Sequence, residues 1–308
     1  QAINEGLQQE MARDERVLIM GEDVGANGGV FRATQGLYDE FGAERAVDTP
    51  LAESGIIGAA IGMAAYGLRP VPEIQFDGFM TPAFDQFVSH AARLRWRTRG
   101  RFTCTLTVRV PYGGGIRALH HHSEAPEAYY VHTPGFKVVL PSNPYDAKGL
   151  LLAAIRDPDP VIYFEPKRLY RAFRQDVPDE EYEVPLGKAA VVQAGQDVTV
   201  IAWGSMVRVA EEAVKRAVTI AAAGRHNMLM IGPPGSGKTM IAKALPGVMP
   251  SLTPEEAIEI TRIYSAAGHS APQNSTGHTN GHAQKGLVTI RPVRSPHHTA
   301  SMAAVIGG

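Results

Sequence analysis

The stretch that most constrains this chain runs from Val47 to Phe79 and reads VDTPLAESGIIGAAIGMAAYGLRPVPEIQFDGF. Its pattern predicts the end of a buried strand, a turn with one carboxylate at Glu53, a helix of small residues and a second strand that ends among aromatics. The helix, Ser54 to Gly67, contains three interior glycines, although each costs roughly 1 kcal/mol relative to alanine. The small residues therefore indicate a close neighbour, which is either another backbone or a partner subunit.

Glu53 stands at the mouth of this predicted helix, and the residues alone leave two roles open for it. A carboxylate in the first turn complements the positive end of the helix dipole. A carboxylate aimed into a cleft can instead transfer a proton during a reaction. Spacing alone favours the helix-end role.

Strand-like and helix-like segments alternate through the first two thirds of the chain. We predict helices at residues 2–14, 37–41, 79–96 and 144–156, and strands at 16–20, 103–110, 136–140 and 160–164. Such alternation is typical of parallel β-α units with helices on both faces of the sheet. We therefore predict an α/β domain with a parallel sheet over residues 1–185. An acidic connector at 175–184 then leads to a strand at 197–203 and a helix at 205–217, the start of a second α/β domain over 186–217.

Composition narrows the class of protein. A length of 308 residues favours about two domains, and a net charge of -1 argues against a general nucleic-acid-binding surface. The single cysteine, Cys104, excludes an intrachain disulfide and fits a reducing compartment. No apolar run of about 18 residues and no secretory leader is present, so we expect no membrane span and a cytoplasmic location.

A phosphate-binding loop follows an apolar segment, Asn227 to Ile231, and fits the pattern G-x-x-x-x-G-K-[ST] between a strand and a helix. In that context Lys238 reaches the β- and γ-phosphates of ATP, and Thr239 ligates magnesium. The backbone that cradles the phosphates belongs to Gly232, Pro233, Pro234, Gly235, Ser236 and Gly237. Further along, Thr253 and Glu256 predict a capping box at the start of a helix, Pro254 to Ser265.

Three consecutive histidines, His120 to His122, raise the question of a metal site. Adjacent residues on an extended chain point to alternate faces, and no carboxylate or cysteine stands at ligand spacing. The residues alone therefore favour a solvated polar loop.

A series of motifs gives residues 1 to about 216 a family resemblance. In order, the chain contains GEDVG, GLYDEFG, DTPLAESGIIG, GLRPVPEIQF, PYGGGIR, HSEAPEA, HTPGFKVVLPSNPYDAKGLL, AIRDPDPVIYFEPKRLY and VPLGKA. This part resembles the β subunit of the thiamine-diphosphate-dependent E1 component of 2-oxoacid dehydrogenase complexes, of the pyruvate or branched-chain type. The resemblance implies a thiamine-diphosphate-binding, transketolase pyrimidine-type parallel sheet domain over residues 1–185. It also implies that residues 186–217 are the truncated start of a transketolase C-terminal-type domain.

The resemblance also implies roles for individual residues, and it reverses the first interpretation of Glu53. In that family this carboxylate lies against a ring nitrogen of the aminopyrimidine and promotes loss of a proton from the thiazolium carbon. Phe79 corresponds to the aromatic packed against the pyrimidine, with Phe76 a weaker candidate. His122 corresponds to an active-site histidine near the acyl group and the lipoyl entrance. Backbone carbonyls near Asp157 and Asp159 could hold a monovalent cation such as potassium, as in some relatives, although a plain turn is the alternative.

The implied activity is oxidative decarboxylation of pyruvate or a branched-chain 2-oxo acid, with acyl transfer to a lipoyl-bearing E2. The motif that binds magnesium and diphosphate, Gly-Asp-Gly followed by Asn, belongs to the α subunit in that family, and this sequence lacks it. The resemblance therefore implies activity only with an E1 α subunit, in an α2β2 heterotetramer.

Residues 218–308 resemble a different family, the magnesium-chelatase-like AAA+ ATPases, through the segments around GPPGSGKT and RSPHHT. This implies a partial P-loop AAA+ fold. No apolar strand ending in acidic residues follows the loop before Gly308, so we do not expect ATP turnover by this chain alone. Because the two resemblances meet inside one predicted helix near Ala217 and Val218, the sequence suggests a chimera. The alternatives to the dehydrogenase subunit are an ATP-binding fragment and a non-functional composite with a partly folded C-terminal portion.

Overall fold

The computed structural model describes residues 1–194, 199–223, 252–266 and 288. The chain divides into two compact units, the first made of residues 1–190 and 202–209 and the second of 191–201 and 210–308. The predicted domain limits at residues 185 and 217 stay predictions. The P-loop at 232–239 lies outside the described residues.

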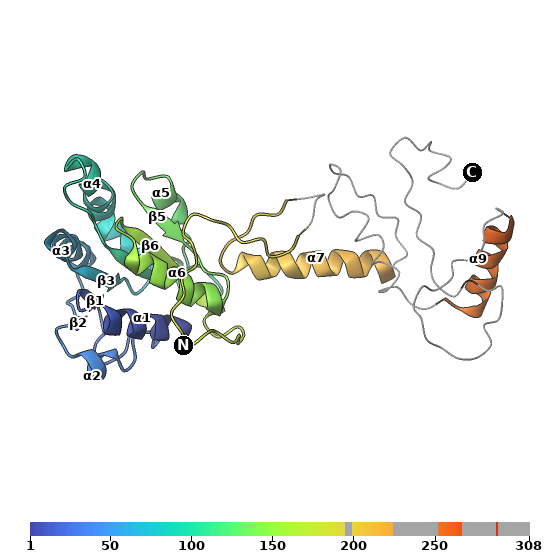
Figure 1. The fold of residues 1–308 in the computed structure, drawn as a ribbon, viewed down its shortest axis with the longest axis horizontal. Coiled ribbons are helices and arrows are strands. Elements are labelled where there is room, and N and C mark those ends of the chain that lie inside the picture. The colour runs from blue at the N-terminus through green and yellow to red at the C-terminus, as the bar shows by residue number, and fades with distance from the viewer. Residues whose placement is uncertain (195–198, 224–251, 267–287, 289–308) are drawn as a thin grey trace. The chain divides into compact units, whose positions relative to one another are not determined.

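A parallel sheet of six strands forms the centre of the first unit (Figure 1). Its strands are β1 (Val17–Gly21), β2 (Ala46–Asp48), β3 (Arg69–Glu73), β4 (Thr107–Tyr112), β5 (Lys137–Val139) and β6 (Val161–Pro166). They lie in the order β2-β1-β3-β4-β6-β5, and every pairing is parallel. The predicted α/β class with a parallel sheet is confirmed.

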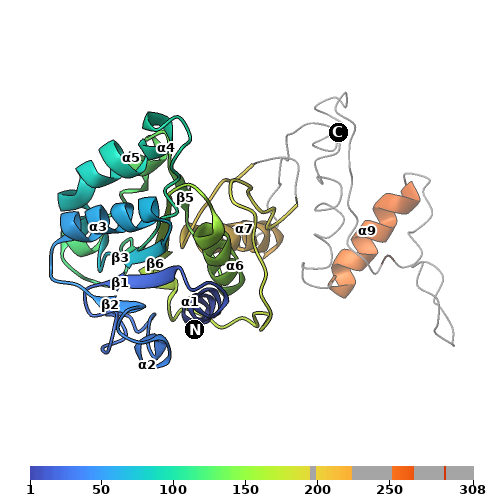
Figure 2. The same ribbon diagram turned by 60° about the vertical axis from the view of Figure 1, so that its left-hand side comes forward.

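Helices cover both faces of the sheet, as strands buried on both faces require (Figure 2). On one face α1 (Ala2–Arg13) packs against α6 (Pro144–Arg156), and α2 (Leu37–Phe41) adds Leu37 to the same core. The other face carries α3 (Glu53–Tyr66), the 3-10 turn η1 (Asp77–Ala83), the π-helical turn η2 (Gln86–Ala91) and α5 (Glu127–Val131). The first unit therefore has three layers with a hydrophobic core on each side of the sheet.

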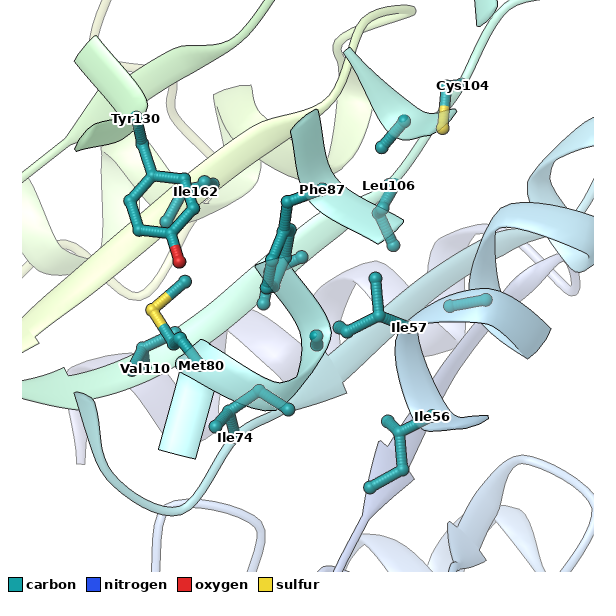
Figure 3. Packing of buried hydrophobic residues seen from close by; sticks show 14 of the residues in the cluster. Ile56, Ile57, Ile74, Met80, Phe87, Cys104, Leu106, Val110, Tyr130 and Ile162 are labelled. Atoms are coloured by element: carbon teal, nitrogen blue, oxygen red, sulfur yellow. The ribbon is translucent and has the colours of Figure 1, made fainter. Parts of the chain in front are cut away.

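The larger core lies under α3 and η2. Figure 3 shows Ile57 of α3, Phe87 of η2 and Tyr130 of α5 converging on the sheet. The Phe87 and Tyr130 rings meet at 5.4 Å between centroids, and both side chains are buried. This core fixes the elements whose ends carry the candidate site.

The predicted helix at 79–96 is wrong as a single element. The structure has three short pieces instead, η1, η2 and α4 (Leu94–Arg97). Pro82 lies inside the first piece. It lacks an N–H and its ring clashes with the preceding turn, so a regular α-helix cannot continue through it. The extra residue of the π turn then resets which side chains face the core.

The predicted strand at 197–203 is also wrong where the structure describes it. Residues 199–203 form no strand, and the Ile201 side chain is 80% exposed. An isolated strand leaves its backbone groups unpaired, and no described strand lies beside these residues to complete the hydrogen bonds. The helix predicted after it is present as α7 (Met206–Ala223).

In the second unit the described residues contain α9 (Pro254–Ala266). Its start confirms the predicted capping box, because the Thr253 N–H donates to the Glu256 carboxylate at 3.0 Å and the Glu256 N–H donates to the Thr253 hydroxyl at 3.3 Å.

Candidate active site

The carboxyl edge of the sheet gathers the residues that the sequence singled out in the first unit. Glu53 begins α3 after β2, Phe76 and Phe79 follow β3, and His122 ends η3 (His120–His122) after β4. The two strands that follow β1 in the chain, β2 and β3, lie on opposite sides of β1 in the sheet. The strand order therefore reverses at β1. Ligands of open α/β sheets bind in the crevice outside the carboxyl ends of the strands at such a reversal.

An aromatic cluster occupies this edge. The Phe76 ring lies 4.2 Å from the His122 ring and 5.7 Å from the Phe79 ring, measured between centroids. Phe79 lies 5.2 Å from His122, and all three contacts are edge-to-face. Phe31, from the loop after β1, closes on Phe76 at 5.7 Å. Side chains from three strand ends thus form one apolar wall.

His122 brings an available polar atom into that wall. Its Nδ1 is buried and has no hydrogen-bond partner. Buried polar atoms are nearly always satisfied in folded proteins, so an unpaired one points to an absent partner such as a ligand. The histidine identified from the resemblance thus carries a buried, unpaired nitrogen within this wall.

Gly78 allows the loop after β3 to pack closely against η3. A Cβ at this position would lie 2.3 Å from the His121 carbonyl oxygen, which is inside any allowed contact. Only glycine lets the loop after β3 touch η3 so closely.

Glu53 is the first residue of α3 and is only 8% exposed. Its carboxylate forms no hydrogen bond or ion pair with any residue that the structure describes. Neither carboxylate oxygen is among the fully buried unpaired side-chain atoms, so the carboxylate keeps access to solvent at the sheet edge and is open to a group from outside the described residues. The carboxylate also acts on Glu22, at the end of β1. Burial raises the pKa of Glu22, and the negative charges of Glu53 and Asp23 raise it further.

A buried ion pair between Asp77 and Lys167, which the sequence analysis missed, lies next to the aromatic wall. Asp77 accepts hydrogen bonds from the Lys167 ammonium at 3.0 Å and from the Gly113 N–H at 2.7 Å, and both charged side chains are fully buried. The Lys167 ammonium also lies 5.4 Å from the centroid of the Phe76 ring. Burial raises the pKa of Asp77 and lowers that of Lys167, and in each case the bond between them opposes the shift. The pair ties the ends of β3, β4 and β6 together.

A second buried network lies deeper in the sheet. Arg109 of β4 donates to Glu73 of β3 at 2.8 Å and to Glu165 of β6 at 2.7 Å, and the Tyr170 hydroxyl donates to Glu165. Burial raises the pKa of Glu73, although the positive charge of Arg109 opposes this. A signal for this network was available, because Glu73, Arg109 and Glu165 each interrupt a strand-like apolar run, and the one positive charge can neutralise the two negative ones only if the strands are neighbours.

Asp157 and Asp159 lie at the opposite edge of the sheet, between α6 and β6. Lys137 donates to both Asp157 carboxylate oxygens at 2.7 Å, and Arg95 pairs with Asp159. These lysine and arginine side chains already neutralise both carboxylates. A monovalent cation on the nearby backbone carbonyls stays a prediction. Within the described ranges no three His, Cys, Asp or Glu side chains cluster as metal ligands.

The ATP-binding prediction for Gly232 to Thr239 cannot be placed in this geometry, because those residues lie outside the described ones. Among the helices that the structure describes, none has the length and apolarity needed to cross a membrane.

Two protein families match the chain one after the other. Residues 1–172 match the family described as transketolase, pyrimidine binding domain, and residues 206–308 match the family described as magnesium chelatase, subunit ChlI. The expected combination of two families in one chain is therefore confirmed.

Several relatives resemble the N-terminal part of the chain. The pyruvate dehydrogenase E1 component subunit beta of Acholeplasma laidlawii is 59% identical over 215 residues, which cover 70% of this chain and 66% of that protein. The 2-oxoisovalerate dehydrogenase subunit beta of Bacillus subtilis is 52% identical with the same coverage. The 3-methyl-2-oxobutanoate dehydrogenase subunit beta of Mycobacterium tuberculosis is 58% identical over 210 residues, 68% of this chain and 60% of that protein. The chain thus spans slightly less than two thirds of the length of these relatives.

Among solved structures, a split gene transketolase described as an inactive beta4 tetramer matches with a TM-score of 0.55. It is 18% identical, and the match covers 70% of this chain and 65% of that one. At this identity the likeness concerns the fold alone.

Proposed function

We propose, since the chain belongs to the transketolase pyrimidine-binding domain family, that its first 216 or so residues serve as the β subunit of a thiamine-diphosphate-dependent 2-oxoacid dehydrogenase. The observation that carries this proposal is Glu53. It is a largely buried residue whose carboxylate has no partner among the described residues and keeps access to solvent, at the same sheet edge as Phe76, Phe79 and His122.

The residues present fit the pyrimidine half of thiamine diphosphate. Glu53 offers a carboxylate to a ring nitrogen, and Phe79, with Phe76 beside it, offers an aromatic surface for the ring. The unpaired Nδ1 of His122 offers a polar contact beyond the aromatic wall. When bound, the cofactor supplies the electron sink that decarboxylation of a 2-oxo acid requires.

Each of these residues has a distinct task. Glu53 holds a proton at the pyrimidine ring nitrogen and so sets the protonation state of the ring. Phe76 and Phe79 orient the ring and keep water from it. His122 contacts the reacting acyl group or the incoming lipoyl arm through its imidazole nitrogens.

Partners complete the proposed site. An E1 α subunit contributes the magnesium and diphosphate half, in an α2β2 heterotetramer, and a lipoyl-bearing E2 accepts the acyl group. The substrate is pyruvate or a branched-chain 2-oxo acid. The names of the relatives from Acholeplasma laidlawii and Bacillus subtilis support both substrate classes.

The test combines the full chain with a cognate α subunit, thiamine diphosphate and magnesium, and follows decarboxylation of each 2-oxo acid with an artificial electron acceptor. Removing one proton-transfer group costs about a hundredfold or more in rate, so Glu53→Gln should lose that much. The matched control is Glu44→Gln, since Glu44 is an exposed carboxylate before β2. Undiminished activity of Glu53→Gln would refute the assigned role, and inactivity of the unsubstituted chain would refute the function.

A second candidate function is nucleotide binding, and the magnesium chelatase match over 206–308 supports it. We propose that Gly232 to Gly237 wrap the phosphates of ATP while Lys238 and Thr239 contact phosphate and magnesium. Lys238→Ala should abolish binding of labelled ATP, whereas Lys243→Ala, outside the motif, should leave it. Equal binding by the chain and Lys238→Ala would reject this function.

A further inference from the structure

A dense group of positive charges lies at the edge of the sheet where the strands begin. Arg93, Arg95, Arg97, Arg99 and Arg101 alternate with other residues around α4, and all five are exposed. Arg95 pairs with Asp159, but the other four form no ion pair with any residue in the described part of the chain. The whole chain has a net charge of -1, so this concentration of charge is local.

Arg95 and Trp96 of this segment line a half-open, mostly apolar hollow. Its volume is about 260 Å³, and Ala91, Trp96, Cys104 and Phe136 contribute to its lining. Trp96 is 81% exposed, and Phe102, the residue after the last arginine, is 49% exposed. Phe102 borders a second hollow together with Arg97, Arg99 and Arg101. Exposed apolar surface rimmed by polar residues marks a site where a partner binds.

This region is separate from the candidate active site. The hollow is bordered by Cys104 before β4, Phe136 before β5 and Pro160 before β6, so it lies at the amino ends of these strands. Glu53, Phe76, Phe79 and His122 lie after the carboxyl ends of their strands. The candidate active site therefore lies apart from this region, although Asp159, near the predicted cation site, also lines the hollow.

We propose that this region is a docking surface for an acidic polypeptide segment that carries one large apolar side chain. We name it the arginine-tryptophan surface, made of Arg93, Arg97, Arg99, Arg101, Trp96 and the hollow. The arginines pair with carboxylates of the segment, and its apolar side chain enters the hollow against Trp96 and Phe136. Arginine and tryptophan are the residue types most enriched where protein partners bind strongly, usually around a desolvated pocket.

A polypeptide fits this surface better than a nucleic acid does. Nucleic acids need positive charge along an extended groove or stripe, together with stacking platforms for successive bases. Here the charge is confined to residues 93–101, and the hollow is a half-open recess of about 260 Å³, which suits one side chain rather than a row of bases. Complementary charge at the rim speeds association and selects the partner, while the apolar seat holds it.

The first test uses Trp96 as its own reporter. The chain has two tryptophans, so Trp203→Phe leaves Trp96 as the sole emitter. The probe is a short synthetic peptide of glutamates around one central leucine. We expect saturable binding that changes Trp96 fluorescence and that weakens as added salt shortens the screening length, about 10 Å at 0.1 M. A peptide with glycine in place of leucine should bind several-fold more weakly.

Variants then test whether the peptide binds this surface or responds only to the overall positive charge of the chain. Two exposed ion pairs together contribute between about twofold and thirtyfold in affinity, so Arg97→Gln/Arg101→Gln should weaken binding of dye-labelled peptide by that amount. Arg171→Gln/Arg174→Gln removes the same charge from two other exposed arginines and should not change the affinity. Trp96→Ala should weaken the leucine peptide but not the glycine peptide.

Three results would overturn the proposal. Equal affinity for the leucine and glycine peptides would remove the role of the hollow. Equal loss in the two arginine pairs would show that only net charge matters. Tighter binding of an oligouridylate RNA than of the peptide would assign the surface to nucleic acid.

Discussion

Lys167 lies fully buried, with its ammonium on Asp77 and over the Phe76 ring. Removing one member of a buried ion pair leaves the other charged and unpaired, which costs about 3–5 kcal/mol. We therefore predict that Lys167→Met lowers the free energy of unfolding by about that amount in urea denaturation. Lys167→Met/Asp77→Asn should recover much of the loss, because the amide still accepts the Gly113 N–H without a charge. A double variant as unstable as the single one would argue against this account.

Glu22 gives a second test at the scale of single residues. Its pKa is raised by burial and then by the negative charges of Glu53 and Asp23. Because the folded pKa lies above the unfolded one, the stability from Glu22 is fully present below the unfolded pKa and is lost as pH rises through the folded pKa. We predict that Glu53→Gln lowers the folded-state Glu22 pKa in a carbon-detected NMR titration, so the loss of stability becomes smaller and is complete at lower pH. Asp39→Asn, on exposed α2, should leave the titration unchanged.

The site could be predicted from sequence only in part, and the missing part has a physical reason. Motifs named Glu53, Phe76, Phe79 and His122 through a family resemblance, but the contacts among three of them arise from separate strand ends. No pattern within a strand reveals which side chains meet across a sheet edge. The Asp77 and Lys167 pair was missed for the same reason, since 90 residues separate its members.

The glycines show how one residue type acts differently in different elements. Gly78 has no room for a Cβ, since it would lie 2.3 Å from the His121 carbonyl oxygen. Gly62, on the exposed face of α3, has no atom within 4 Å of that position. We predict that Gly78→Ala destabilises the chain by about 1–3 kcal/mol, because η1 and η3 must separate. Gly62→Ala should stabilise it by roughly 1 kcal/mol, because alanine favours the helix.

Thermal unfolding of both variants checks this pair, and a crystal structure of Gly78→Ala shows whether η3 moves. Equal changes in stability would mean that helix propensity alone governs both positions. If Gly62→Ala is more stable alone but assembles poorly with the α subunit, the small residues of α3 serve contact with a partner, as the sequence suggested.

Elements were predicted well where local signals agree. Helix α6 runs from Pro144 to Arg156 as expected, because Asn143 caps it by accepting the Asp146 N–H and proline is tolerated in its first turn. The region 79–96 failed because its apolar spacing suits one helix, whereas Pro82 breaks the first turn and the π turn η2 interrupts the regular spacing after it. The strand expected at 197–203 failed because strand formation depends on neighbours that local sequence does not specify.

At the scale of the whole molecule, two families follow one another in a chain that divides into two units. We predict two unfolding transitions in calorimetry. ATP with magnesium should raise the free energy of unfolding for only one of the two transitions, by about 2.7 kcal/mol at a hundredfold excess over the dissociation constant. Lys238→Ala should remove that shift while leaving the other transition unchanged. If there is a single transition, and ATP shifts the whole of it to higher temperature, the two units unfold together.

The all-parallel sheet also bears on how the chain folds as it is made. Val17 pairs with Arg69 and Thr107 pairs with Val161, so each of these strand pairings must close a long loop. Loop closure must occur before such contacts provide stability, which makes sheets of this kind slow to form. On the ribosome β1 must wait for β3, and β4 for β6, with apolar strand surfaces exposed meanwhile. We infer that early synthesis is the stage at which this chain depends most on chaperones.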